Sequence, residues 1–141
     1  MKKRNLSAAK RIHKFYLDKL KNPKIKKIYL EFERNLGSFN LAKFSIAVSG
    51  GIDSMALAFL AKCHSIKRKQ NHLYFTVDHK LRSTSTKEAI QTKKQLKKYG
   101  INCDILTWTN NKTSSNFQAK ARDKRYDLIF QKSLNKNVNL V

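Results

Sequence analysis

The sequence has few cysteines, few glycines and little acid. Its 141 residues include two cysteines, one proline, four glycines and nine acidic residues. Cys63 and Cys103 stand far apart and form no C-x-x-C pair, which excludes a zinc ribbon or a dithiol motif. We expect both to be small buried hydrophobic residues in a reducing cytosol. No apolar run approaches the roughly 18 residues of a membrane span or resembles a signal peptide, so the sequence predicts a cytoplasmic protein without membrane contact.

Basic residues dominate the charge. Lys and Arg number 31, so the formal net charge is +22. Such a protein is attracted to polyanions, of which nucleic acid is the first candidate. The alternative is compositional bias, because Lys and Asn are abundant along the whole chain. Hydrophobic residues make up 40%, enough for the core of one modest α/β domain despite a mean hydropathy of -0.60.

The stretch 44–60 organises the chain. It reads as a short apolar strand, a loop with two adjacent glycines, and an apolar helix that begins near Asp53. Two glycines allow positive φ and a close approach of the backbone to a ligand, and amide groups at a helix start attract phosphate. A tight turn with no ligand is the alternative. The coincidence of glycines, hydroxyls and a carboxylate favours a phosphate cradle, formed by Ser49, Gly50, Gly51, Ile52, Asp53 and Ser54.

The remaining pattern alternates strands with helices. The chain order is a helix over 28–36 closed by Gly37, a strand over 72–78, a helix from Ser83 or Thr84 to Gly100, a strand over 101–108, a helix starting at Ser115, and the opening of a fourth strand over 137–141. This order predicts an α/β fold with a parallel sheet and flanking helices. Ligands of such sheets bind beyond the carboxyl ends of the strands, which is where residues 49–54 and 78–82 fall.

Residues 1–27 form a basic extension. Its apolar positions allow a basic amphipathic helix that ends before Pro23. The composition slightly favours a solvated, poorly ordered extension instead, and either form could touch RNA.

Two further segments carry candidate site residues. Asp78 and His79 follow the second strand and can accept hydrogen bonds from an adenosine. An isolated histidine at a surface turn is the alternative, and no partner at ligand spacing suggests a metal. Arg122 and Arg125 lie three apart on the last helix, where two guanidiniums can clamp phosphates. A solvated basic face is the alternative there.

Together these segments carry a resemblance. Val48–Ser54, VSGGIDS, resembles the pyrophosphate loop of the N-type ATP pyrophosphatases (the PP-loop superfamily) and differs from the P-loop, which ends in Gly-Lys-Ser/Thr. With Asp78-His79-x-Leu81-Arg82 and Ala121-Arg122-x-x-Arg125-Tyr126, the sequence resembles the tRNA(Ile)-lysidine synthase family. The match runs from about residue 28 to 141.

The resemblance implies a function. Members of the family use ATP and Mg²⁺ to adenylylate the wobble cytidine of a tRNA(Ile) with a CAU anticodon, and free lysine then displaces AMP to give lysidine. Carried over, Ser49 to Ser54 would hold the phosphates, and Asp53 would bind the metal or act in catalysis. Asp78 and His79 would border the adenosine. Arg122 would meet ATP or the transition state. The implied fold is Rossmann-like, of the adenine nucleotide alpha hydrolase type.

The sequence departs from the family at its end. The family continues into a His-His-x-x-Asp-Asp segment and tRNA-gripping domains, whereas this sequence stops at Val141. We therefore expect residues 28–141 to be the N-terminal part of an incomplete PP-loop catalytic domain. The remainder would be a separately encoded C-terminal half, unless the chain is a fragment or a remnant. We also expect weak ATP binding by the chain alone.

Two other functions stay open. One is a catalytically inactive or partner-dependent basic module that binds nucleotide or RNA. The other is a tRNA thiolation enzyme of the same superfamily, for which Cys63 and Cys103 supply no obvious reactive pair. A flavodoxin-like fold without phosphate chemistry would leave the Ser-Gly-Gly-x-Asp-Ser loop unexplained.

Overall fold

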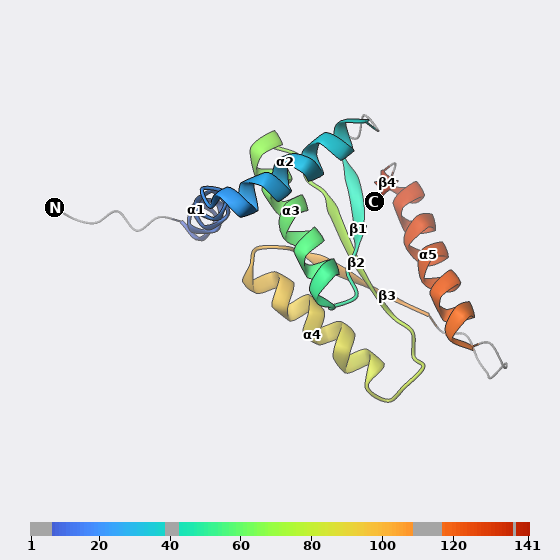
Figure 1. Cartoon of the computed structure of the whole chain (residues 1–141). Helices are drawn as coiled ribbons and strands as arrows, with labels where there is room; N and C mark the ends of the chain where they lie inside the picture. The colour runs from blue at the N-terminus through green and yellow to red at the C-terminus, as the bar shows by residue number, and fades with distance from the viewer. Residues whose placement is uncertain (1–6, 39–42, 109–116, 137) are drawn as a thin grey trace.

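A computed structural model describes residues 7–38, 43–108, 117–136 and 138–141. Within these residues the chain forms a four-stranded parallel sheet with the order β3-β2-β1-β4, flanked by helices (Figure 1). The predicted α/β class is therefore confirmed. The helices are α1 (Ala8–Lys19), α2 (Pro23–Ser38), α3 (Ile52–Arg68), α4 (Ser85–Lys98) and α5 (Phe117–Asn135). The strands are β1 (Phe44–Ala47), β2 (Leu73–Asp78), β3 (Cys103–Thr107) and β4 (Asn139–Leu140).

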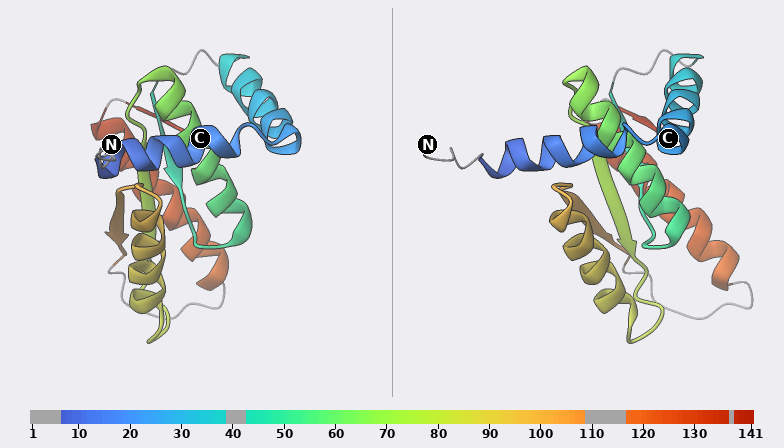
Figure 2. Two further views of the ribbon diagram at one scale, coloured as in Figure 1. Left: turned by 90° about the vertical axis from the view of Figure 1, so that its left-hand side faces the viewer. Right: turned by 60° about the vertical axis from the view of Figure 1, so that its left-hand side comes forward.

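The helices cover the sheet on both faces. Helices α3 and α4 lie on one face and α5 lies on the other, while α1 and α2 pack on the outer side of α3 (Figures 1 and 2). Parallel neighbours need crossover connections, and α3, α4 and α5 supply them. Strands β1 and β2 are therefore enclosed from both sides and carry largely apolar side chains.

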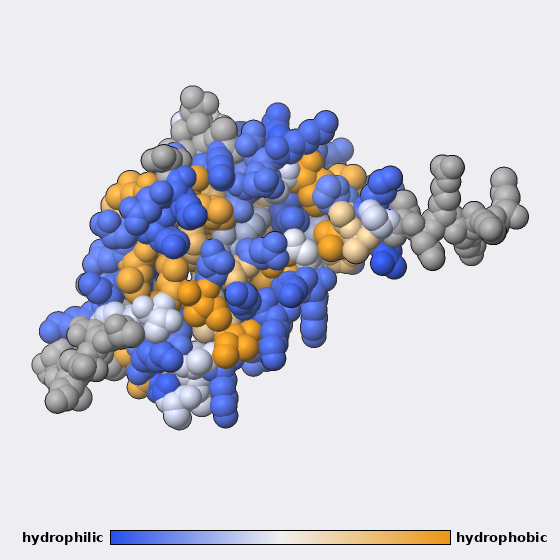
Figure 3. All heavy atoms as spheres, turned by 180° about the vertical axis from the view of Figure 1, so that it is seen from behind, coloured by the Kyte–Doolittle hydropathy of each residue, from blue (hydrophilic) through white to orange (hydrophobic). Residues whose placement is uncertain are grey.

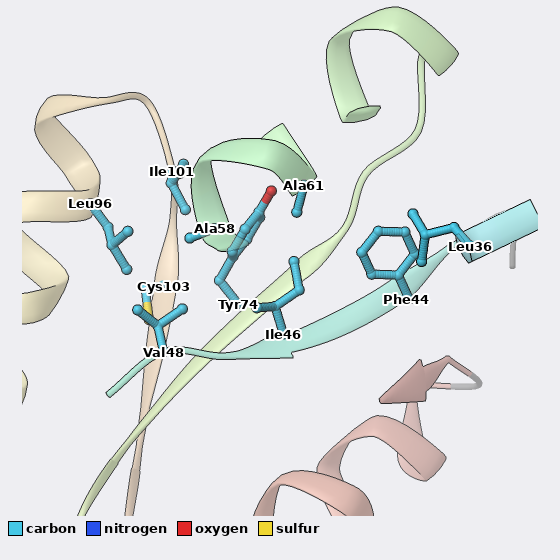
Figure 4. Close-up of a cluster of buried hydrophobic side chains, with 10 residues drawn as sticks. All are labelled: Leu36, Phe44, Ile46, Val48, Ala58, Ala61, Tyr74, Leu96, Ile101 and Cys103. Carbon is cyan, nitrogen blue, oxygen red and sulfur yellow. The ribbon is translucent and has the colours of Figure 1, made fainter. Parts of the chain in front are cut away.

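The main core lies between β1, β2 and the helices α3 and α4 (Figure 4). Phe44 and Ile46 of β1 are fully buried, as the apolar pattern predicts. Burial raises the pKa of Cys63 and of Cys103 to about 12, so both thiols stay protonated at neutral pH. This agrees with their expected role as small hydrophobic residues. The buried cluster consists of Leu36, Phe44, Ile46, Val48, Ala58, Ala61, Tyr74, Leu96, Ile101 and Cys103.

The N-terminal segment differs from the solvated extension that we favoured. Residues 8–19 form α1, whose start is capped by the Ser7 hydroxyl accepting from the Lys10 N–H. Tyr16 is fully buried and packs in a second core cluster with Tyr29 and Cys63. The expectation of poor order is wrong for this helix, because its buried face uses partners from α2 and α3 that are distant in the sequence.

The helix expected over 28–36 is longer than its pattern suggested. It begins at Pro23, a residue that suits the first turn because it lacks the N–H group that would stay unpaired there. Gly37 lies within the helix rather than after it. Gly100, by contrast, does end its element: it has φ +71 and follows Tyr99, the C-cap residue of α4.

Some expectations about boundaries lie outside the described residues, namely the helix start at Ser115 and the strand position of Asn137. The fourth strand is present, and Asn139 and Leu140 pair with β1. In the part of the chain that the structure describes, every helix is too short or too polar to cross a membrane. The face opposite to that of Figure 1 is mostly hydrophilic, with patches of hydrophobic side chains (Figure 3).

Candidate functional site

The loop between β1 and α3 is closed by hydrogen bonds between its own residues. The Ser54 hydroxyl accepts from the Ser49 N–H at 3.1 Å and donates to the Gly51 carbonyl at 2.9 Å. The Gly51 N–H donates to the Ser49 hydroxyl at 3.3 Å. Both serines therefore hold the backbone of the loop, which fixes the direction of its remaining amide groups.

The two glycines of the loop have different conformations. Gly50 has φ +90, and a Cβ atom there would lie 2.5 Å from the Thr92 hydroxyl oxygen on α4. Gly51 is extended, with φ -71 and ψ 161, and is the N-cap residue of α3. The expected freedom of two glycines is therefore needed at Gly50 only. At Gly51 the missing side chain leaves the helix start open.

The start of α3 presents free amide groups and one carboxylate. Among the described residues no side chain caps this end, and the first N–H groups of a helix have no partner within the helix. Asp53 lies exposed in the first turn, and Gly51 occupies the N-cap position before it. Ile52 is 87% exposed and projects from the same turn. An anion at this end is stabilised by the helix dipole.

A cavity of about 370 Å³ opens at the carboxyl edge of the sheet, beside this loop. It lies between the ends of β1 and β2 and the helices α4 and α5. Its size falls in the range of sites for small ligands. It is lined by Ala47, Val48, Ser49, Ser54, Phe75, Thr76, Val77, His79, Leu81, Arg82, Ser85, Glu88, Ala89, Arg125, Tyr126 and Ile129.

Two polar groups of the cavity wall are buried without a hydrogen-bond partner among the described residues. They are Nδ1 of His79 and Nε of Arg125. Burial lowers the pKa of His79, the positive charges of Arg125 and Arg82 lower it further, and Asp78 opposes them. His79 is therefore neutral at pH 7. Because buried polar groups normally find partners, these two atoms mark a place where a polar ligand would complete the structure.

Asp78 has a different environment from its neighbour His79. Its side chain is almost completely buried and is absent from the cavity wall. One carboxylate oxygen accepts from the Lys80 N–H at 3.0 Å, and the other accepts from the Thr86 hydroxyl at 2.7 Å. The Lys80 ammonium completes an ion pair at 3.3 Å. The structure thus has Asp78 at the end of β2, where it holds the turn that leads to α4, while His79 lines the cavity.

The two arginines of α5 also lie in different environments. Arg125 and Tyr126 line the cavity, whereas Arg122 is exposed and is not part of its wall. The structure therefore joins Arg125 with the loop and His79, and leaves Arg122 nearer the start of α5.

Sequence reasoning placed Arg82 at the ligand edge of the sheet, but it gave no role to Glu88, Ser85 or Thr92. Arg82 pairs with Glu88 at 3.4 Å, and this pair lies in the cavity wall with Ser85. Thr92 contacts the loop at Gly50. Ser85 and Thr92 belong to the buried side of α4, together with Ala89 and Leu96. The spacing of these four residues in the sequence is that of one side of a helix, and it could have predicted that they share a buried side.

The fold and the site together define the class of the protein. Residues 19–141 match the family model described as the PP-loop domain, so this chain belongs to the PP-loop domain family. The chain is 37% identical to the tRNA(Ile)-lysidine synthase of Rickettsia bellii over 106 residues. It is 38% identical to that of Rickettsia typhi over 111 residues and 36% identical to that of Bartonella henselae over 101 residues. The resemblance seen in the sequence is thereby confirmed.

The matched region covers a large share of this chain and a small share of each relative. It includes 72% of this chain in both Rickettsia comparisons and 70% in the Bartonella one. It includes only 25% of each of those Rickettsia proteins and 20% of the Bartonella protein. The chain thus spans about a quarter or less of the length of these relatives. No solved structure matches it.

Proposed function

We propose that this chain binds ATP and takes part in a tRNA-modifying ligase reaction in which the adenylyl group is transferred to a tRNA base. The observation that carries the proposal is the position of the PP-loop. Ser49 and Ser54 line the same cavity as His79 and Arg125, at the carboxyl edge of a parallel sheet. Nucleotides bind at this edge in such folds.

The residues of the cavity and of the loop fit a nucleoside triphosphate. The free amide groups at the start of α3 and the Arg125 guanidinium suit phosphate oxygens. The apolar wall formed by Val48, Val77 and Ile129 suits a base, and His79 has an unpaired ring nitrogen for a polar atom of the adenosine. The Asp78 carboxylate already accepts hydrogen bonds from Lys80 and Thr86. We therefore propose that it borders the adenosine site indirectly, by holding the turn that carries His79.

The donor set for Mg²⁺ is one carboxylate. Among the described residues no group of three or more His, Cys, Asp or Glu side chains converges on a point. Mg²⁺ is commonly held by one or two carboxylates together with the phosphates of its substrate. Asp53, exposed beside the phosphate loop, suits that arrangement, so we propose Asp53 as the magnesium ligand and as a catalytic residue.

For the finer chemistry we propose the reaction named for the relatives. ATP transfers its adenylyl group to the wobble cytidine of tRNA(Ile) with a CAU anticodon and releases pyrophosphate, and free lysine then displaces AMP to give lysidine. The chain's part is to hold the phosphates and to stabilise charge that develops at the α-phosphate through fixed amide groups and arginine. We propose Arg122 for that last role, since it lies about one helical turn before Arg125 and is free to reach outward.

The remaining parts of the reaction are proposed to come from polypeptide outside the matched region. The matched part makes up 25% of the Rickettsia bellii relative, and we propose that polypeptide equivalent to the C-terminal part of that relative supplies the rest. The chain itself then contributes the ATP site and part of the tRNA surface.

A second candidate is a binding module that has no catalytic activity of its own. The strong positive charge favours it, because 31 Lys and Arg against nine acidic residues attract nucleic acid without any catalysis. A thiolation enzyme is disfavoured, since both cysteines are buried and burial raises the pKa of each thiol to about 12.

The test measures ATP binding and lysine transfer separately. ATP with Mg²⁺ is titrated into the chain by calorimetry, and labelled lysine is incorporated into a tRNA(Ile) transcript by the chain alone and by the chain mixed with the C-terminal remainder of the Rickettsia bellii relative. ATP binding with transfer only in the mixture supports the proposal. ATP binding without transfer in either favours the binding module. No ATP binding overturns both.

A further inference from the structure

The outer side of α4 is strongly basic. Its buried side consists of Ser85, Ala89, Thr92 and Leu96. Its exposed residues include five lysines, Lys87, Lys93, Lys94, Lys97 and Lys98, and the helix contains a single acidic residue, Glu88. Because residues 87, 94 and 98 point away from the buried side and 93 and 97 flank them, the lysines cover the outer surface of the helix.

These lysines carry no neutralising partner within the described ranges. The ion pairs there use other bases, such as Arg68 with Glu33, Lys80 with Asp78 and Arg82 with Glu88. Five like charges on one helix repel one another. The positive potential of α4 is therefore left for an anionic partner.

Helix α1 extends this basic surface past the end of α4. The Tyr16 hydroxyl donates to the Tyr99 carbonyl at 2.8 Å, and Ile12 packs against Gly100. Arg11 and Lys19 lie one turn to either side of Phe15 on the same side of α1, and the Lys19 ammonium stands 5.6 Å from the Phe15 ring centre.

The junction of the two helices also exposes aromatic rings. Phe15 is 37% exposed and Tyr99 is 48% exposed, with their ring centres 6.0 Å apart. Exposed rings among basic residues are typical of surfaces that bind RNA, because bases stack on them while the phosphates meet the charges.

The other end of α4 reaches the cavity. Ser85, Glu88 and Ala89 belong to the cavity wall. The 14 residues of α4 span about 21 Å, and the C-terminal end of the helix lies on the side of α1 (Figure 1). The lysines of α4 therefore lie between the cavity wall at Ser85 and the contact of Tyr16 with Tyr99. An RNA whose nucleotide meets the bound ATP at the mouth of the cavity would have its neighbouring phosphates over this helix.

We propose that the outer side of α4, with Arg11 and Lys19 of α1, is the surface on which this protein binds the phosphate backbone of RNA. We call it the α4–α1 surface. The identity of the RNA as a tRNA rests on the proposed function. The positive charge and the aromatic rings of the α4–α1 surface do not depend on ATP binding. RNA is favoured over a lipid surface because α4 exposes one large apolar side chain, Ile90, and lacks the apolar side that inserts into a membrane.

The test compares two variants with the same change of charge. In the first, Lys93, Lys94, Lys97 and Lys98 are replaced by Gln; in the second, Lys24, Lys26, Lys27 and Arg34 of α2 are replaced by Gln. All eight residues are exposed, and α2 lies at the opposite end of the sheet from α4 (Figure 1). Binding of an anticodon stem-loop RNA with a CAU loop is measured over a series of salt concentrations. Binding of phosphatidylglycerol vesicles and of ATP is measured in parallel.

The α4 variant is expected to bind the RNA at least tenfold more weakly at low salt, with a slope of log K against log salt that is smaller by about three. The α2 variant should lose less than threefold. Equal loss in both variants would overturn the proposal in favour of general charge, and loss of vesicle binding without loss of RNA binding would overturn it in favour of a membrane. Absence of ATP binding in every form would contradict the proposed function alone and leave the α4–α1 surface supported by the RNA result.

Discussion

Gly50 and Thr92 lie against each other where the phosphate loop meets α4. A Cβ atom at Gly50 would lie 2.5 Å from Thr92 Oγ1, and Gly50 also has φ +90. The Thr92 hydroxyl is held in place because it donates to the Glu88 carbonyl at 3.0 Å. Glycine is therefore required at this position both by the backbone conformation and by the lack of space.

The variant Gly50→Ala is expected to lower the free energy of unfolding by about 1–2 kcal/mol, from the left-handed conformation alone. The contact with Thr92 should in addition displace the loop and weaken ATP binding at least tenfold. Urea denaturation and ATP titration measure the two effects.

The matched control is Gly37→Ala. In the part of the chain that the structure describes, no atom lies within 4 Å of a Cβ added at Gly37. The residue is inside a helix, so Ala should leave stability unchanged or raise it by up to about 1 kcal/mol. Equal stability and equal ATP binding of the two variants would contradict this account of the loop.

The two arginines of α5 should differ in their effect on ATP. Arg125 lines the cavity with a buried Nε that has no partner among the described residues, whereas Arg122 is exposed. Arg125→Gln is expected to weaken ATP binding at least tenfold, because a charged partner of the phosphates is lost. Arg122→Gln should change it less than threefold. Equal loss in both variants would place Arg122 in the ATP site as well.

Asp78 and Thr86 hold the turn before α4. Burial would raise the pKa of Asp78, but hydrogen bonds from the Thr86 hydroxyl and from Lys80 outweigh it and keep the pKa below its usual value. A lowered carboxylate pKa means that this stabilisation is present near neutral pH and is lost as the pH falls through the folded-state pKa, below about 4.

Thr86→Val is expected to raise the pKa of Asp78 and to lower the free energy of unfolding at pH 7 by about 1–3 kcal/mol, because a hydrogen bond to a buried charged group is lost. NMR titration of the Asp78 carboxyl and urea denaturation measure the two changes. Thr84→Val is the control, since the Thr84 hydroxyl donates to the exposed Glu88 carboxylate instead. An unchanged Asp78 pKa in Thr86→Val would refute the role of that hydroxyl.

The local parts of the fold were predictable from the sequence. The alternation of strands and helices, the loop over 49–54 and the closing role of Gly100 depend on residues close together in the chain. Their apolar spacing and glycine positions therefore carried enough information to predict a parallel α/β sheet with a site at its carboxyl edge.

The parts that depend on distant partners were not predictable. Which arginine of α5 faces the cavity is set by the rotation of that helix, whose buried residues include Ile129 and Ser133. The order of α1 depends on Tyr16 reaching Tyr99, which lies far along the chain. The crowding of Gly50 by Thr92 likewise joins two elements, so no local pattern reports it.

His72 and His64 form a buried pair beside Phe44. The Phe44 N–H donates to Nδ1 of His72 at 3.4 Å, so the proton of the neutral His72 ring is on Nε2. That nitrogen stands 2.8 Å from Nδ1 of His64 and donates to it. The ring of His72 also stacks on Phe44, with centres 3.8 Å apart. Protonation of His72 would place a second N–H against the Phe44 N–H.

The pH dependence of the free energy of unfolding should show the protonation of this histidine pair. Burial lowers the pKa of His72 to about 4, with further contributions from His64, Lys43 and Lys62, and burial lowers the pKa of His64 as well. Because the unfolded chain takes up protons near pH 6.5 and the folded chain does not, stability is full above that pH and falls as the pH drops toward 4, by about 3 kcal/mol for His72.

His72→Phe should remove most of this fall in stability, while it lowers stability at pH 7.5 through two lost hydrogen bonds. His13→Gln, a change at an exposed histidine, should keep the wild-type profile. Denaturant unfolding from pH 7.5 to 4 tests the pair, and a wild-type profile that His72→Phe leaves unaltered would show that the pair does not titrate as its geometry requires.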